Sequence, residues 1–168
     1  MNILYTERLV LRQFRNDDSA AMYKNWTYDE RVAKYCRWYP HKSIEETKEY
    51  LKLCLGAEYC WAITLKDNDE PIGCIDLVGV NIYGVSEIGY VLMYEHWGQG
   101  IMTEAVKAVI DELFRCGFEK IGACHMIDNP ASGRVMEKCG MVYVGNYMMQ
   151  KKFGCEEQCE VRYYEINR

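Results

Sequence analysis

The sequence predicts a single α+β domain over residues 1–168, with a largely antiparallel sheet and a local β-α-β core. Three apolar segments, 59–65, 72–80 and 85–94, follow one another across short turns and predict a three-stranded antiparallel meander. The third segment is almost wholly apolar, which favours a central place in the sheet because both faces of such a strand are buried. Helical and extended patterns then alternate to residue 166, as expected of strand-helix-strand units.

Before the meander, the patterns predict a strand and three helical stretches, over residues 6–14, 17–26, 31–37 and 43–55. Asp17 or Asp18 can cap the first helix. Ser43 and Glu46 form a capping box at the start of the third. This part of the chain is therefore expected to be mainly helical.

After the meander, two helices and three strands are predicted, over residues 102–117, 120–127, 129–140, 141–151 and 158–166. The first helix has an apolar face formed by Met102, Ala105, Val106, Val109, Ile110 and Leu113, opposite a polar and charged face. The second helix begins at Asn129 as cap, and its predicted apolar face is Ala131, Val135 and Cys139.

Composition and charge narrow the function classes. A net charge of −5 and a pI of about 5.3 argue against a nucleic-acid partner and fit an amine-bearing one. The chain lacks a signal-peptide pattern and any apolar run of the ~18 residues that a membrane span needs, so we expect a soluble cytoplasmic protein. The nine cysteines show no Cys-x-x-Cys motif or standard zinc spacing, so reduced thiols and no metal are expected.

A glycine turn joins the central strand to the amphipathic helix. Gly98 and Gly100 flank a single residue, so backbone N–H groups there can approach a ligand without a Cβ in the way. The first N–H groups of a helix are unpaired and carry the positive end of its dipole, which favours phosphate. A diphosphate-bearing cofactor is therefore predicted here, although a plain tight connection produces the same pattern.

Four short motifs stand in order along nearly the whole chain. They are Thr-Glu-Arg-Leu-Val-Leu-Arg at 6–12, Glu-Ile-Gly-Tyr at 87–90, Trp-Gly-Gln-Gly-Ile-Met-Thr-Glu-Ala at 97–105, and Asn-Pro-Ala-Ser-Gly-Arg-Val-Met-Glu-Lys-Cys-Gly-Met at 129–141. In sequence and order they resemble the GNAT superfamily of N-acetyltransferases, most nearly its ribosomal-protein N-alpha-acetyltransferase branch. The resemblance implies one GNAT-like domain whose mixed, mostly antiparallel sheet is splayed at the centre, with helices on both faces.

The resemblance further implies acetyl-CoA as donor and a primary amine as acceptor, which attacks directly in a ternary complex. The diphosphate is implied to bind at Trp97, Gly98, Gln99, Gly100, Ile101, Met102 and Thr103. Pantetheine is implied to pair like an added strand along Val91, Leu92 and Met93. Asn129 and Ser132 are implied to contact the cofactor arm.

Two methionines depart from the family pattern. The glycine turn usually closes on Gly or Ala, and here Met102 either points into the core or narrows the diphosphate site. Many relatives carry a tyrosine as general acid seven residues after the asparagine, where this chain has Met136. Ser132 is the alternative acid, in competition with a role in local hydrogen bonds. A non-catalytic acetyl-CoA-binding module therefore stays open as the alternative function.

Glu87 is the candidate general base. An amine attacks a thioester only when it is neutral, so the site needs a group that takes the proton. Glu87 is the one carboxylate in its apolar strand, and burial would raise its pKa and make it a better base. The alternative is a structural carboxylate that accepts hydrogen bonds from backbone amides.

The acceptor site is predicted in residues 26–39, where aromatic residues alternate with acidic ones. The candidate substrate-binding residues are Trp26, Tyr35, Trp38 and Glu87. Packing of two short helices explains most of the aromatic cluster; if it explains all of it, the acceptor wall has to come from the final hairpin, around residues 147–153. The acceptor is either a protein N-terminus or a small amine, and the chain is either a monomer or a homodimer.

Overall fold

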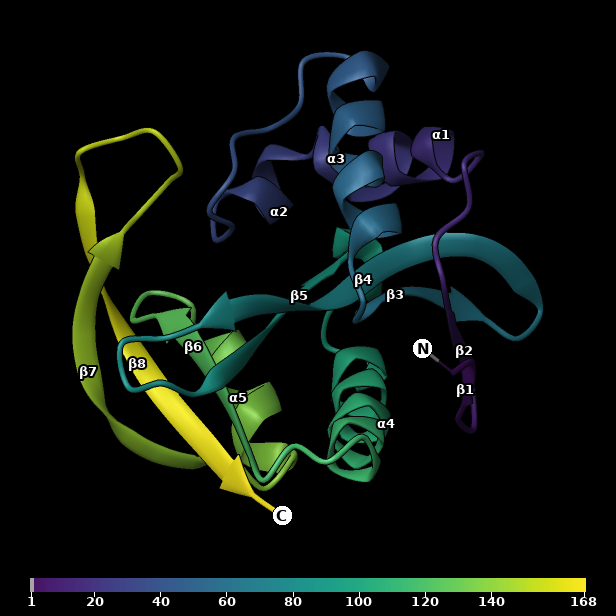
Figure 1. The fold of residues 1–168 in the computed structure, drawn as a ribbon. Helices are drawn as coiled ribbons and strands as arrows, with labels where there is room; N and C mark the ends of the chain where they lie inside the picture. The colour runs from purple at the N-terminus through teal and green to yellow at the C-terminus, as the bar shows by residue number, and fades with distance from the viewer. Residues whose placement is uncertain (1) are drawn as a thin grey trace.

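The computed structural model describes residues 2–168, in which one mixed sheet carries helices on both faces (Figure 1). The strands are β1 (Leu4–Tyr5), β2 (Leu9–Arg12), β3 (Cys60–Leu65), β4 (Asn68–Val80), β5 (Ser86–Leu92), β6 (Lys120–Met126), β7 (Val142–Gln150) and β8 (Gln158–Asn167). Their order across the sheet is β1-β2-β3-β4-β5-β6-β8-β7. The β5–β6 pair is parallel and the other neighbours are antiparallel, which confirms the predicted fold class.

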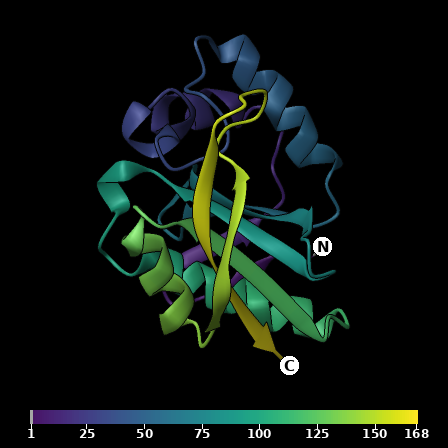
Figure 2. The same cartoon turned by 90° about the vertical axis from the view of Figure 1, so that its left-hand side faces the viewer.

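Two helical layers cover the sheet. On one side lie α1 (Ser19–Met22), its π-helical continuation η1 (Tyr23–Thr27), α2 (Glu30–Ala33) and α3 (Ile44–Gly56). On the other side lie α4 (Ile101–Arg115) and α5 (Pro130–Lys138), and the 3-10 turn η2 (Tyr94–His96) leads from β5 toward α4. In Figure 2, β7 and β8 rise past the sheet and reach the layer of α1–α3.

β5 lies at the centre of the sheet, as its apolar sequence predicts, and there the sheet opens. It pairs with β4 from Ser86 to Leu92, but with β6 at the single pair Glu87 and Gly122. β6 instead pairs along its length with β8. Beyond Glu87 the two strands diverge, so the edge of β5 is open for hydrogen bonding. We call this opening the β5–β6 gap.

Two apolar cores fix the helical layers to the sheet. The core under α4 and α5 buries the predicted apolar face of α4, namely Met102, Ala105, Val106, Val109, Ile110 and Leu113. The core under α1–α3 contains, among others, Met22, Trp26, Leu51, Cys54, Cys60 and Cys74. The central strands are therefore covered on both faces, which explains their near-continuous apolar sequence.

The start of α3 follows its sequence signal. Ser43 Oγ accepts a hydrogen bond from the Glu46 backbone N–H at 3.4 Å, and Glu46 Oε2 accepts one from the Lys42 N–H at 2.8 Å. The two reciprocal hydrogen bonds of a capping box are thus present, except that Glu46 accepts from the N–H of Lys42 and not from that of the N-cap Ser43. The helix runs to Gly56, close to the predicted end.

The predicted buried face of α5 was wrong by about one helical position. The helix buries Gly133 and Met136, whereas Ala131 is exposed and Val135 is half-buried. Of the predicted face, Cys139 at the C-cap is buried as expected. The reason is close packing on β6, because a Cβ at Gly133 would lie 2.5 Å from His125 Nε2. The face of α5 that contains Gly133 is therefore the one that packs on the sheet, because only glycine permits this close contact with β6.

Several other boundaries differ from the predictions. The first strand is a short hairpin of β1 and β2, the helix after Asp18 becomes π-helical in η1, and β4 begins at Asn68 instead of residue 72. Among residues 2–168, no helix has the length and apolar character to cross a membrane, and no group of three potential metal-ligating side chains is present. All nine cysteines of the chain are free thiols.

Candidate active site

The glycine turn (residues 97–100) joins η2 to α4 and contains two glycines with positive φ. Gly98 and Gly100 have φ values of +74° and +76°, in the left-handed region that residues with a Cβ rarely adopt. Gly100 is the N-cap of α4, and no side chain caps it. Its carbonyl accepts the Glu104 N–H at 3.0 Å, so the preceding N–H groups of the first turn lie at the helix start. The turn and helix start thus offer donors and a positive dipole end to an anion.

Met102 points into the core. Its side chain is 6% exposed and packs in the core under α4, beside Ile101. Its backbone N–H remains in the first helical turn, where it has no intrahelical acceptor. The geometry therefore favours the first alternative for Met102. Its side chain belongs to the core and does not narrow the predicted diphosphate site.

An ion pair that the sequence reasoning missed lies against the glycine turn. Arg8 Nε pairs with Glu104 Oε2 at 2.7 Å, and an Arg8 terminal nitrogen donates to the Gln99 carbonyl at 3.0 Å. Thr6 Oγ1 donates to Glu104 Oε1 at 2.5 Å. Burial acts to raise the pKa of Glu104, but the hydrogen bonds from Thr6 and Arg8 outweigh it and the pKa is lowered. The motif at 6–12 therefore places a guanidinium beside the predicted diphosphate site.

Some backbone groups of residues 91–93, where pantetheine is predicted to bind, already have hydrogen-bond partners in the protein. The Met93 N–H donates to the Ile72 carbonyl at 2.7 Å, and the Leu92 carbonyl accepts from Trp97 Nε1 at 2.8 Å. Val91 is buried in the core under α1–α3. A ligand pairing along β5 in the gap thus has to use the remaining backbone groups of this strand.

Glu87 stands where the β5–β6 gap begins. Its side chain is buried, at 8% exposed, and its Oε1 accepts from Asn81 Nδ2 at 3.2 Å and from the Tyr147 hydroxyl at 3.3 Å. Burial raises the pKa of Glu87, while these two donors and the charge of Arg37 oppose the rise. The result is a carboxylate that holds a proton more readily than an exposed glutamate does.

Ser132 lies in the first turn of α5, on the other side of the strand. Asn129 caps this helix, and its Oδ1 accepts from the Ser132 N–H at 3.4 Å. The Ser132 hydroxyl lies 2.7 Å from the hydroxyl of Tyr90, which is three residues from Glu87 on β5. Successive strand residues face opposite ways, so β5 directs Glu87 and Tyr90 to opposite faces. Met136, in place of the family tyrosine, is 1% exposed and belongs to the core.

The structure separates the three aromatic residues that were grouped as acceptor-binding. Trp26 is 0% exposed and lies in the core under α1–α3, so it has no surface for a substrate. Tyr35 and Trp38 are half-buried in the connection from α2 to α3. Trp38 also packs on the edge of that core. Trp26 is therefore a residue of the core, while Tyr35 and Trp38 remain candidates for binding the acceptor.

The tip of the β7–β8 hairpin (residues 151–157) folds onto that same connection. Lys152 Nζ donates to the carbonyls of Cys36 and Trp38 at 2.9 and 3.1 Å, and also to that of Ala33. The Phe153 N–H donates to the Arg37 carbonyl at 2.7 Å, and the Arg37 guanidinium lies 4.4 Å from the Phe153 ring centre. The two alternative sources of the acceptor wall thus form one continuous structure.

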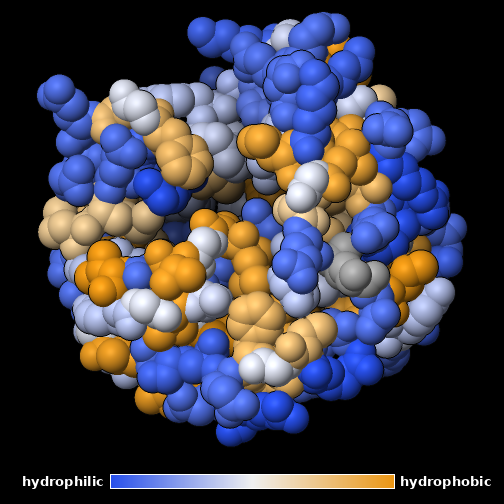
Figure 3. Space-filling view, viewed as in Figure 1, coloured by the Kyte–Doolittle hydropathy of each residue, from blue (hydrophilic) through white to orange (hydrophobic). Residues whose placement is uncertain are grey.

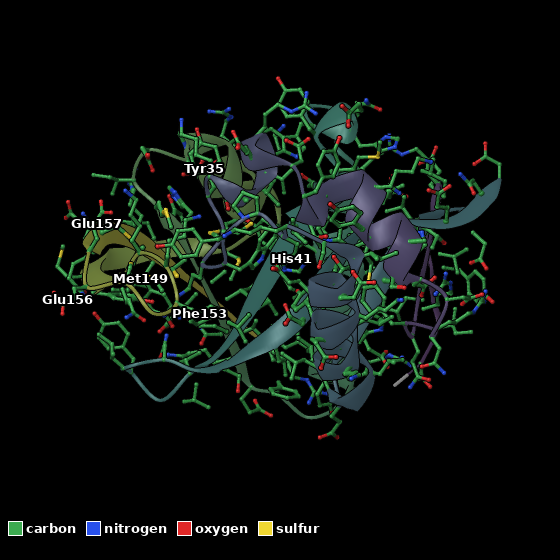
Figure 4. All side chains as sticks on the ribbon, turned by 90° about the horizontal axis from the view of Figure 1, so that it is seen from above. Tyr35, His41, Met149, Phe153, Glu156 and Glu157 are labelled. Atoms are coloured by element: carbon green, nitrogen blue, oxygen red, sulfur yellow. The ribbon has the colours of Figure 1, made fainter. Side chains whose placement is uncertain are left out.

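Figures 3 and 4 show this end of the molecule. In Figure 4, Tyr35 lies on the same side as Met149 and Phe153 of the hairpin, with His41 nearer α3. In Figure 3, the surface is hollowed between the hairpin tip and the helical layer, with hydrophobic side chains around the hollow. Tyr147, which contacts Glu87, belongs to the same hairpin and connects it with the start of the gap.

Comparisons with known proteins identify the family of the chain. The family model of the acetyltransferase (GNAT) domain matches residues 8–142. The chain is 33% identical over 159 residues to the uncharacterized N-acetyltransferase YoaA of Bacillus subtilis (strain 168), covering 88% of this chain and 89% of the relative.

Solved structures show the same fold. A GNAT-family acetyltransferase from Bacillus anthracis superposes with a TM-score of 0.86 at 27% identity, over 99% of this chain and 98% of that one. RimL, a ribosomal L7/L12 alpha-N-protein acetyltransferase in complex with coenzyme A, superposes with a TM-score of 0.82 at 22% identity, over 99% and 98% of the two chains.

Proposed function

Because the chain belongs to the GNAT acetyltransferase family, we propose that it transfers the acetyl group of acetyl-CoA to a primary amine that binds between the β7–β8 hairpin and the α2–α3 connection. The observation that carries the proposal is the β5–β6 gap, which opens at the buried Glu87. The glycine turn follows the far end of the same strand. One strand thus joins a diphosphate site to a candidate base.

The residues around the gap fit acetyl-CoA as the donor. The backbone of residues 97–103 would hold the diphosphate, with the Arg8 guanidinium beside it. Free backbone groups of β5 would pair with the two pantetheine amides. Asn129 and Ser132, at the start of α5, would border the cofactor arm. Acetyl-CoA supplies an activated acyl group, and the chain supplies its position and the proton transfers.

Glu87 would act as the base, directly or through a water molecule. It takes a proton from the ammonium, so that the neutral amine nitrogen attacks the thioester carbonyl. The N–C bond forms, the C–S bond breaks, and its electron pair goes to the CoA sulfur. The nitrogen then loses its second proton, which passes through water to the CoA thiolate, and Glu87 returns its own proton to the solvent. The raised pKa of Glu87 favours proton uptake, since a base is most effective when its pKa approaches the operating pH. Ser132 would donate a hydrogen bond to the departing sulfur.

A screen of amines tests this function. Thiol release from acetyl-CoA is measured with peptides of free N-terminus, polyamines and aminoglycosides, and acetylated products are identified by mass spectrometry. Calorimetry with CoA, with and without a chelator, measures donor binding and is expected to give the same Kd in both. Failure to bind CoA at millimolar concentration, or binding without transfer to any amine, would contradict the proposal.

Tyr35→Ala is expected to raise the KM for the acceptor by about tenfold and to leave the Kd for CoA unchanged. The reason is position, because Tyr35 is half-buried in the α2–α3 connection, onto which the hairpin tip folds. Steady-state kinetics with the amine identified by the screen measure the effect.

The matched control is Tyr5→Ala, which removes an exposed tyrosine of β1, outside residues 26–39 and the β7–β8 hairpin, and is expected to leave the acceptor KM unchanged. If Tyr35→Ala lowers the melting temperature and leaves the acceptor KM at the wild-type value, the side chain belongs to the core only.

A further inference from the structure

A pair of hydroxyl groups connects β5 with α5 across the β5–β6 gap. The Tyr90 and Ser132 hydroxyl oxygens lie 2.7 Å apart, and the Tyr90 hydroxyl is also 3.0 Å from the Ser132 backbone carbonyl. Tyr90 belongs to β5, three residues beyond the last pair between β5 and β6. The two residues are 42 positions apart in the chain, so tertiary packing brings them together.

The Tyr90 hydroxyl has one hydrogen to donate, and two acceptors lie within its reach, the carbonyl and the hydroxyl oxygen of Ser132. If Tyr90 donates to the Ser132 carbonyl, the serine hydroxyl can turn its own hydrogen back to the phenol oxygen, 2.7 Å away. If Tyr90 donates instead to Ser132 Oγ, the serine hydrogen is free to point into the gap. The same pair of residues thus has two hydrogen-bond arrangements. In the second, the phenol no longer accepts the serine hydrogen, so Tyr90 directs the Ser132 donor away from itself and toward a ligand in the gap.

We propose that Tyr90 is a positioning residue for acetyl transfer: it turns the Ser132 hydroxyl into a donor for the CoA sulfur as the acetyl group leaves. The proposal rests on the proposed function. The C–S electron pair goes to sulfur, the serine hydrogen forms a bond to it, and both hydroxyls keep their protons. An oxygen that accepts a hydrogen bond donates a stronger one, and a bond to an anion is stronger again.

The surroundings of Tyr90 support this role. Burial raises its pKa, so the phenol stays protonated and able to donate at physiological pH. Met136, one turn further along α5 than Ser132, is buried in the core and offers no hydroxyl group. In this chain a tyrosine hydroxyl therefore reaches the start of α5 from the strand and not from the helix.

A second tyrosine provides the matched control. Tyr164, on β8, donates its hydroxyl to Glu137 Oε1 at 3.2 Å and so also ties α5 to the sheet. Glu137 lies in the last turns of α5, away from Ser132. If Tyr90 were only a structural tie, Tyr90→Phe and Tyr164→Phe would have the same kind of effect.

The experiment measures the thiol pKa of bound CoA, from the ultraviolet absorbance of the thiolate during a pH titration of the complex. Tyr90→Phe is expected to raise this pKa by about one pH unit and to lower kcat by about tenfold. Tyr164→Phe is expected to match the wild type in both. In a Ser132→Ala background, Tyr90→Phe should add no further change, because its effect passes through the serine.

Wild-type values of the bound-thiol pKa and of kcat in Tyr90→Phe, with a lowered melting temperature, would overturn the proposal. Should Tyr90→Phe fail to fold, an unchanged bound-thiol pKa in Ser132→Ala would overturn it equally. The titration needs no acceptor, so a chain that binds CoA but acetylates no amine refutes the proposed function separately from this inference. Loss of CoA binding in the wild type would refute both.

Discussion

Replacing Glu87 by glutamine is expected to lower kcat for acetyl transfer by roughly 10²-fold or more, while the Kd for CoA stays unchanged. The amide keeps the Oε1 acceptor used by Asn81 and Tyr147, so the local structure is retained. It cannot take the proton of an ammonium, so the loss falls on the chemical step. Steady-state kinetics and calorimetry with CoA separate the two effects.

The pH profile makes this test more specific. In the wild type, kcat/KM is expected to rise with pH through the raised pKa of Glu87, because only the carboxylate can act as base. In Glu87→Gln, the rise of kcat/KM that follows the ionisation of Glu87 disappears, and only the pH dependence caused by ionisation of the amine substrate remains. Glu112→Gln is the control, since Glu112 is equally buried but lies near the far end of α4. A normal rate for Glu87→Gln between pH 6 and 9 would make Glu87 structural.

The contribution of Glu87 to the free energy of unfolding should fall as pH rises, whereas its contribution to activity should increase. Burial raises the pKa of Glu87, so the folded state binds this proton more tightly than the unfolded state does. The free energy of unfolding of the wild type therefore falls, relative to that of Glu87→Gln, as pH rises from the ordinary carboxyl pKa through the raised one. Melting curves of both proteins across this range measure the difference.

The second large effect is expected from Gly100→Val, which should weaken CoA binding by about 10²-fold or more. The residue has φ +76°, and its added Cβ would lie 3.6 Å from the Arg8 guanidinium. A branched side chain there occupies the space beside the turn and disfavours the backbone conformation that directs its N–H groups to a diphosphate. Calorimetric titration with CoA measures the change.

Gly117→Val separates backbone strain from loss of the site. Gly117 has φ +97°, and an added Cβ there meets no atom within 4 Å. It follows the end of α4 opposite the turn, so this variant is expected to lose stability and to keep its CoA affinity. Equal CoA affinities for Gly100→Val and the wild type would show that the diphosphate binds elsewhere.

Local sequence signals predicted most of the helices and strands and the glycine turn at which we propose that the diphosphate binds. The continuous apolar run of β5 predicted its central place, and the apolar stripe of α4 predicted the face that is buried. Gly98 and Gly100 predicted a glycine turn at the start of a helix, and the structure gives both residues a positive φ. These features depend on neighbours within a few residues, so a single sequence contains the information.

Only the tertiary structure decided which aromatic and charged side chains belong to the site. Trp26 and Tyr35 occur in one aromatic cluster, but the docking of α1–α3 on the sheet buries the first and leaves the second half-exposed. Arg8 meets Glu104 across 96 residues, and Lys152 meets Cys36 across 116. Such pairs depend on the twist of the sheet and on how its layers pack, which no local pattern encodes. The same holds for Tyr90 and Ser132, whose side chains meet because α5 packs against the sheet beside the gap.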